Sequence, residues 1–206
     1  MFLKKILWVL FFGSLIGLIE TLIGSFNIPY RSIILSSITL SLLSIARLQN
    51  PKTGTSFFII VIAVLFKINS FGVCACTTTV FLCGPTALLL LGIGYEVFAS
   101  LLISKKTFRY LNFVLTCVIT SIIAFSIFAV MNTYILHAWN LNRLAEYIFI
   151  KGIFTAIASS AISILGLFLI RTYKKPYYSK FNPYVINSLL SSVIIALWLF
   201  GSFIKL

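Results

Sequence analysis

The stretch ILWVLFFGSLIGLIETLIGSF, residues 6–26, decides the fold class of this chain. Glu20 is its only charged residue, and its length matches the about 20 apolar residues that a helix needs to cross a hydrocarbon core roughly 30 Å thick. A cleaved signal peptide is the alternative, because Lys4 and Lys5 precede the run. The length of the run, the charge inside it and the lack of a small-x-small cleavage site favour a retained membrane-spanning helix.

Composition extends this interpretation to the whole chain. Of its 206 residues, 61% are hydrophobic and 9% are charged, too few polar side chains to cover a globular domain of this size. Unbroken apolar runs exclude the alternating pattern of barrel strands. The sequence predicts one all-α, polytopic transmembrane helix bundle over residues 1–206, with seven spans, or six if a short one does not cross. The further spans are predicted at 33–46, 56–72, 84–103, 110–136, 148–170 and 184–204, and the second and third spans, 33–46 and 56–72, are short for a full crossing.

The 16 lysines and arginines predict the orientation of the bundle. When alternate connections are assigned to opposite sides, eleven of them lie on one side and five on the other. Basic residues accumulate in cytoplasmic loops, so we predict a cytoplasmic N-terminus. The same clusters lie between apolar runs rather than on one face, so the net charge of +13 does not indicate a nucleic-acid partner.

Two acidic residues lie inside apolar runs, where an unpaired charge costs several kcal/mol. Glu20 is about 9 Å below the outer end of the first span, at about 1.5 Å per helical residue, and Lys67 lies at a similar depth in the third. We predict an ion pair between them, either a structural clip or the charged floor of an outward-facing pocket. Glu96 has no basic residue at its predicted level, so we expect a protonated carboxyl or a hydrogen bond to another helix. Lys151 is expected to pair with Glu146 or to extend outward.

Metal-ligating residue types are sparse. Cys74, Cys76 and Cys83 are close in sequence but form no intact zinc pattern, and an oxidising outer compartment would permit a disulfide among them. The single His137 has no second ligand at ligand spacing. We therefore predict no metal or other cofactor, and no enzyme. The stretch 70–86, rich in small and hydroxyl residues, is compatible with a re-entrant loop facing water.

Gly13 and Gly17 form a small-xxx-small pattern in the first span, which is typical of close helix packing. Together with residues farther along, they resemble the substrate-binding S components of energy-coupling-factor vitamin transporters over residues 13–103. The motifs of this resemblance are Gly13-xxx-Gly17 with Glu20, Ala46-Arg47-Leu48, Pro51-Lys52-x-Gly54-Thr55, Lys67, and Gly84-Pro85-Thr86 with Glu96. A seventh span departs from the six that are usual in the family.

The resemblance implies a bundle in a prokaryotic cell (inner) membrane that binds a vitamin or related micronutrient near its outer face. Transport would need a membrane coupling subunit and ATPase subunits. Carried over to this chain, the ligand would contact Glu20, Lys67, Thr86 and Lys151, and the coupling subunit would dock on Gly13 and Gly17. Two alternatives remain: an ion or metal carrier that uses the cysteines and Glu96, and a structural membrane subunit.

Overall fold

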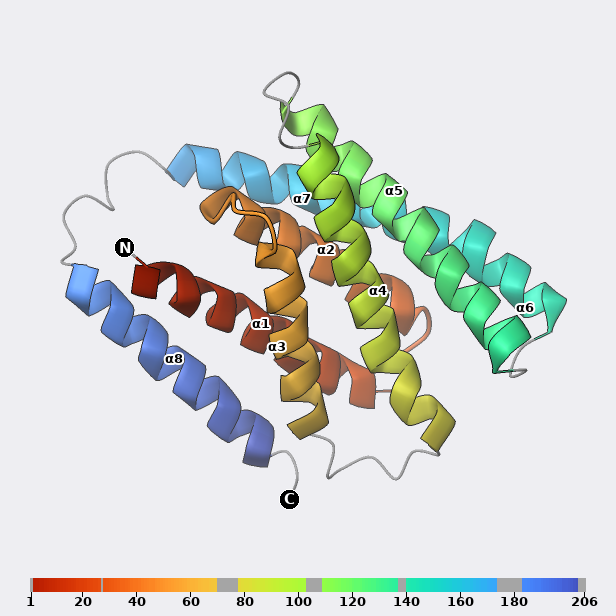
Figure 1. Cartoon of the computed structure of the whole chain (residues 1–206), viewed down its shortest axis with the longest axis horizontal. Helices are drawn as coiled ribbons and strands as arrows, with labels where there is room; N and C mark the ends of the chain where they lie inside the picture. The colour runs from red at the N-terminus through yellow and green to blue at the C-terminus, as the bar shows by residue number, and fades with distance from the viewer. Residues whose placement is uncertain are drawn as a thin grey trace.

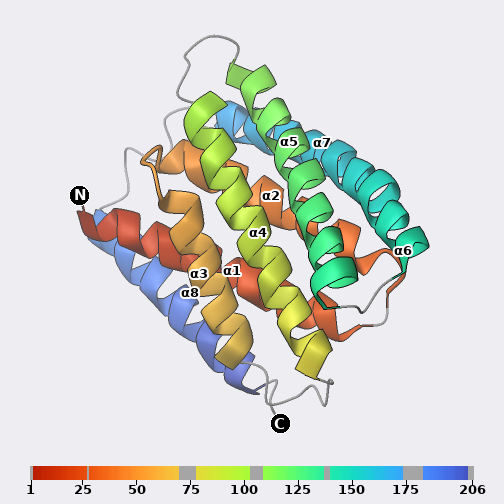
Figure 2. The same ribbon diagram turned by 45° about the vertical axis from the view of Figure 1, so that its right-hand side comes forward.

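The computed structural model of the chain describes residues 2–26, 28–69, 78–102, 109–136, 140–173 and 183–203. Within these ranges it consists of helices and turns and has no strand, which confirms the all-α bundle (Figure 1). Helical segments run back and forth in alternating directions, as a view turned by 45° also shows (Figure 2). The helices are α1 (Phe2–Ser25), α2 (Arg31–Gln49), α3 (Thr55–Asn69), α4 (Thr78–Leu102), α5 (Arg109–Val130), α6 (Leu141–Ala145), α7 (Ile153–Tyr173) and α8 (Pro183–Phe203).

Two π-helical turns interrupt this regular pattern at one end of the bundle. The turn η2 (Met131–Ile135) follows α5, and η3 (Glu146–Gly152) joins α6 to α7 so that the three form one long span. We call this the outer end, following the topology predicted from the basic residues. It also holds the C-terminal ends of α1 and α3 and the start of α2.

In the described part of the chain, six segments are long and apolar enough to cross a membrane, and α3 is a shorter apolar helix. The expectation that the second span is short is wrong, because α2 has 19 residues and extends beyond 33–46 at both ends. The third span is short, as expected, since α3 has 15 residues. Part of the suggested re-entrant loop is also wrong: residues 78–86 belong to α4, while 70–77 lie outside the described residues.

The helix α2 lies at the centre of the bundle and carries many hydroxyl side chains. Ser37, Ser41 and Ser44 each donate to the carbonyl one turn back, at 2.7, 2.7 and 2.9 Å. Such back-bonds satisfy the hydroxyls without water. Farther down, the Tyr95 hydroxyl donates to Ser44 Oγ at 3.0 Å, and Cys117 Sγ lies 3.5 Å from the same oxygen. Polar contacts of this kind join helices in lipid, where apolar packing gives no hydrophobic advantage.

The glycines of α1 allow it to pack very closely against α3. A Cβ at Gly13 would lie 2.7 Å from Ile62 Cβ, and one at Gly17 would lie 2.7 Å from Phe66 Cβ. The small-xxx-small pattern therefore marks a contact within this chain. The docking role that the resemblance gave to Gly13 and Gly17 stays a prediction, and in this structure α3 occupies that face.

Candidate functional site

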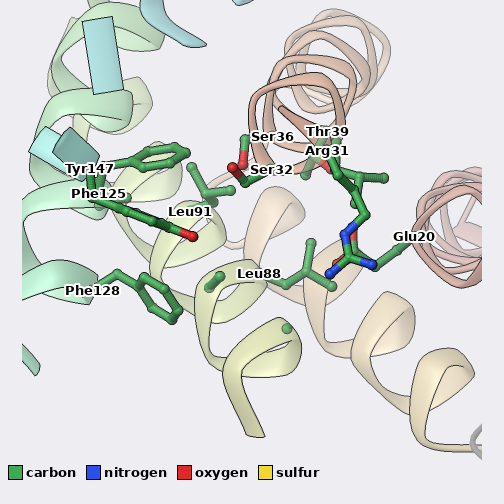
Figure 3. Close-up of a pocket in the computed structure, with 14 residues that line it drawn as sticks. Glu20, Arg31, Ser32, Ser36, Thr39, Leu88, Leu91, Phe125, Phe128 and Tyr147 are labelled. Atoms are coloured by element: carbon green, nitrogen blue, oxygen red, sulfur yellow. The ribbon is translucent and has the colours of Figure 1, made fainter. Parts of the chain in front are cut away.

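A partly open cavity of about 150 Å³ lies at the outer end, between α1, α2, α4, α5 and η3 (Figure 3). Its walls differ in chemistry. Leu88 and Leu91 of α4 line its apolar side, and Glu20 of α1 lies at its edge. Concave sites with an apolar lining and a few polar groups are the usual form of small-molecule pockets.

The predicted ion pair between Glu20 and Lys67 is confirmed. Lys67 Nζ donates to Glu20 Oε1 at 2.7 Å, and both side chains are nearly buried. Gly84 makes room for the pair, because a Cβ there would overlap the Lys67 ammonium and lie 3.7 Å from Glu20 Oε1. Since Glu20 and Gly84 line the cavity, the pair lies along its edge as well as linking α1 to α3.

The wall formed by α2 presents hydroxyl groups that form no back-bond. Ser36 and Thr39 line the cavity and are more than nine-tenths buried. Neither side chain forms a hydrogen bond with another residue in the part of the chain that the structure describes. Ser37 and Ser41 on the same helix do form such bonds. Buried hydroxyls are normally satisfied, so these two have hydrogen-bonding capacity left for a molecule in the cavity.

The opposite wall is aromatic. Phe125 and Phe128 of α5 each lie 6.3 Å, between ring centroids, from Tyr147 of η3. Figure 3 shows the three rings facing α2 across the cavity. The Lys151 ammonium lies 3.7 Å from the centroid of the Tyr147 ring and 3.5 Å from Glu146 Oε1, which confirms the predicted pairing. Lys151 therefore contacts the aromatic wall at Tyr147 and is not among the described residues that line the cavity.

The structure brings together only part of the predicted site. Glu20 lines the cavity and Lys67 holds it, whereas Thr86 and Lys151 are not among the described residues that line it. Sequence analysis missed the hydroxyls of α2 and the aromatic wall. It also missed Arg31, which lines the mouth and donates to the Gly24 carbonyl at 2.5 Å. Only the hydroxyls had a signal in the sequence, the i, i+4, i+7 spacing of residues 32, 36 and 39, which places three of them on one helical face.

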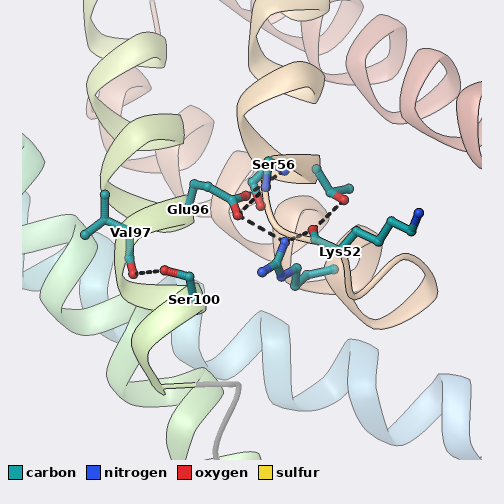
Figure 4. A network of polar contacts seen from close by, with 8 residues as sticks. Lys52, Ser56, Glu96, Val97 and Ser100 are labelled. Atoms are coloured by element: carbon teal, nitrogen blue, oxygen red, sulfur yellow. Dashed lines mark hydrogen bonds and ion pairs between the residues drawn. The ribbon is translucent and has the colours of Figure 1, made fainter.

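A second charged cluster lies at the other end of the bundle and corrects the expectation for Glu96. Its carboxylate pairs with Arg47 at 3.1 Å and accepts from the backbone amides of Gly54, at 2.7 Å, and Ser56, at 2.9 Å. Figure 4 shows Glu96 reaching from α4 to the start of α3. The expectation that no basic residue lies at the level of Glu96 is wrong, because α2 extends past residue 46 and holds Arg47 inside the bundle. The expected hydrogen bond to another helix is present, since the Ser56 amide belongs to α3.

The Glu20–Lys67 pair can be tested by a double-mutant cycle. Glu20→Gln and Lys67→Met each leave one charge unpaired in a poorly solvated setting, so each variant should lower thermal stability, and the double variant should recover part of the loss. We expect a coupling energy of about 0.5–3 kcal/mol. The same cycle on Glu146 and Lys151, where the carboxylate is 46% exposed, should give a smaller value. Additive effects at Glu20 and Lys67 would contradict the pair.

The residues that were weighed as metal ligands in the sequence lie mostly outside the described part of the chain. His137, Cys74 and Cys76 lie outside the described residues, as does the side chain of Cys83. Among the residues that are described, no three His, Cys, Asp or Glu side chains form a group that could hold a metal ion.

Comparisons with models of known families, with curated proteins and with solved structures find no match for this chain.

Proposed function

We propose that this chain is a membrane-embedded binding subunit that captures a small solute at its outer end for uptake. The observation that carries the proposal is the cavity itself, bounded by the Glu20–Lys67 pair, by the unbonded hydroxyls of Ser36 and Thr39, and by an aromatic wall. A clip between helices needs the ion pair alone. It does not need a cavity beside the pair, so a binding role accounts for more of the site.

The charged cluster at the other end of the bundle disfavours the ion-carrier alternative. Glu96, the carboxylate proposed for that role, is held by Arg47 and by two backbone amides of the α3 start. A carboxylate with three donors has little capacity left for a cation. Glu20 is likewise engaged with an ammonium group.

Uptake requires an energy source that this chain does not supply. The sequence contains no Gly-rich phosphate-binding motif of the P-loop type. We therefore propose that it works with a membrane coupling subunit and ATPase subunits, as the resemblance to S components implies, and that the solute is vitamin-like. The coupling subunit would contact a surface other than the Gly13 and Gly17 face, which α3 covers.

Capture can be tested on the purified protein. We expect a small solute to co-purify in near-stoichiometric amount and to be released on denaturation, where mass spectrometry detects it. Ala87→Phe places a ring inside the cavity and should abolish this retention. Ala196→Phe adds the same ring to an exposed position on α8 and should leave it unchanged. A solute that is absent from the parent protein, or retained equally by both variants, would contradict capture in this cavity.

A further inference from the structure

We propose that the solute is a small organic anion that carries one flat apolar ring. This inference rests on the proposed function, because it concerns the ligand of the same cavity. It assigns the anionic group to Arg31 and the start of α2, its polar edge to Ser36 and Thr39, and its ring to the aromatic wall.

The charges around the cavity favour an anion. Glu20 holds the Lys67 ammonium at 2.7 Å, so the two charges compensate each other. Arg31 lines the cavity, and its hydrogen bond goes to the Gly24 carbonyl, which carries no net charge. No carboxylate in the described part of the chain forms an ion pair with Arg31. The Glu20 carboxylate and the Lys67 and Arg31 cations together carry one net positive charge. A bound anion would compensate this charge.

The start of α2 adds to this preference. Arg31 and Ser32 are the first residues of the helix, and both line the cavity. Tyr30 precedes them with φ 58° and provides no side-chain cap. The amino end of a helix carries a partial positive charge and favours anions. Figure 3 shows the Arg31 side chain extending from this helix end toward Glu20.

A cation fits the same place poorly. To reach the Glu20 carboxylate it would compete with the Lys67 ammonium at hydrogen-bond distance, and it would also approach the Arg31 guanidinium. Like charges at such separations repel each other. For an organic cation, repulsion by Lys67 and Arg31 would therefore exceed the attraction of Glu20.

The size and the walls of the cavity define the rest of the molecule. A cavity of about 150 Å³ accommodates one benzene-sized ring. The rings of Phe125, Phe128 and Tyr147 offer faces and edges against which a flat ring packs well. On the opposite wall, Ser36 and Thr39 are one helical turn apart, so both hydroxyls can reach the same edge of a bound molecule.

Four probes separate charge from shape: benzoate, benzamide, benzylammonium and acetate. The first three share a ring and differ in charge, while acetate keeps the carboxylate without the ring. In calorimetric titration of the full-length protein in detergent, benzoate should bind at least about tenfold more tightly than each of the others. Arg31→Gln should remove this advantage over benzamide, and Arg31→Lys should keep most of it. Arg143→Gln, at an exposed position outside the cavity, should change nothing.

The outcomes distinguish this inference from the proposed function. Suppose that benzylammonium or benzamide binds at least as tightly as benzoate and that Ala87→Phe abolishes this binding. The negative charge assigned to the solute is then wrong, whereas the proposed capture in the cavity stands. If acetate binds as tightly as benzoate, the proposal that the solute carries a ring is wrong. If none of the probes binds in a manner that Ala87→Phe abolishes, the ligand class proposed here is wrong, and the co-purification experiment still decides whether the cavity captures a solute. Thermal unfolding of each variant shows that the loss of binding is not a loss of folding.

Discussion

Glu96→Gln should lower the free energy of unfolding by about 3–5 kcal/mol, the range measured when one member of a buried ion pair is removed. The neutral side chain keeps the size of glutamate but leaves Arg47, which is 5% exposed, without its carboxylate. It also weakens the bonds to the Gly54 and Ser56 amides, because charged acceptors bond more strongly than neutral ones. Thermal or denaturant unfolding in detergent measures the loss.

The chain provides a matched control for this substitution. Glu146→Gln removes the same charge from a pair whose carboxylate is 46% exposed, so it should change stability by no more than about 1 kcal/mol. Adding Arg47→Met to Glu96→Gln removes the second buried charge and should restore part of the lost stability. Equal effects of Glu96→Gln and Glu146→Gln would show that the inner cluster does not stabilise the bundle as its geometry implies.

Gly17→Leu should prevent α1 and α3 from packing and cost about 3 kcal/mol or more, beyond the usual range for added core volume. Even a Cβ at this position would lie 2.7 Å from Phe66 Cβ and 3.0 Å from the Ala63 carbonyl oxygen, so the backbones must separate. Lys67 follows Phe66 directly, and Glu20 lies one turn beyond Gly17. The substitution therefore also pulls the ion pair apart.

Gly24→Leu is the control, because a Cβ at Gly24 has no described atom within 4 Å. It lies in the same helix and adds the same side chain, so differences in helix propensity cancel. We expect Gly24→Leu to unfold near the parent temperature and Gly17→Leu to unfold far below it or to aggregate on extraction. Similar behaviour of the two variants would contradict the close contact of α1 with α3.

The sequence was sufficient for the spans and for one ion pair. Runs such as 110–136 predict a helix because lipid leaves the backbone no alternative, and α5 with η2 covers nearly the same residues. The Glu20–Lys67 pair could be predicted from depth alone, since helical rise is constant. The Arg47–Glu96 pair could not, because apolarity ended the second span at residue 46 while the helix continues to Gln49.

The cavity was harder to predict, since periodicity does not show which face of a buried helix meets a space. The helix α2 carries hydroxyls on several sides, and Ser36 and Ser37 are neighbours with different surroundings. Only the packing of α5 and η3 against α2 separates the hydroxyls that face the cavity from those that bond to their own backbone. Thr86 and Lys151 came from the resemblance, which carries no information about this chain's packing.

The helix α3 is short, and a charged group is bound at each of its ends. Glu96 binds its first amides, and Lys67 near its last turn binds Glu20. At about 1.5 Å per residue its 15 residues rise about 22 Å, against roughly 30 Å for an average hydrocarbon core. Phe58 and Leu65 of this helix are more than half exposed, as expected for side chains that face lipid. The described part of α3 is thus about 8 Å shorter than an average hydrocarbon core, and we expect the stability of the protein to fall as lipid chains lengthen.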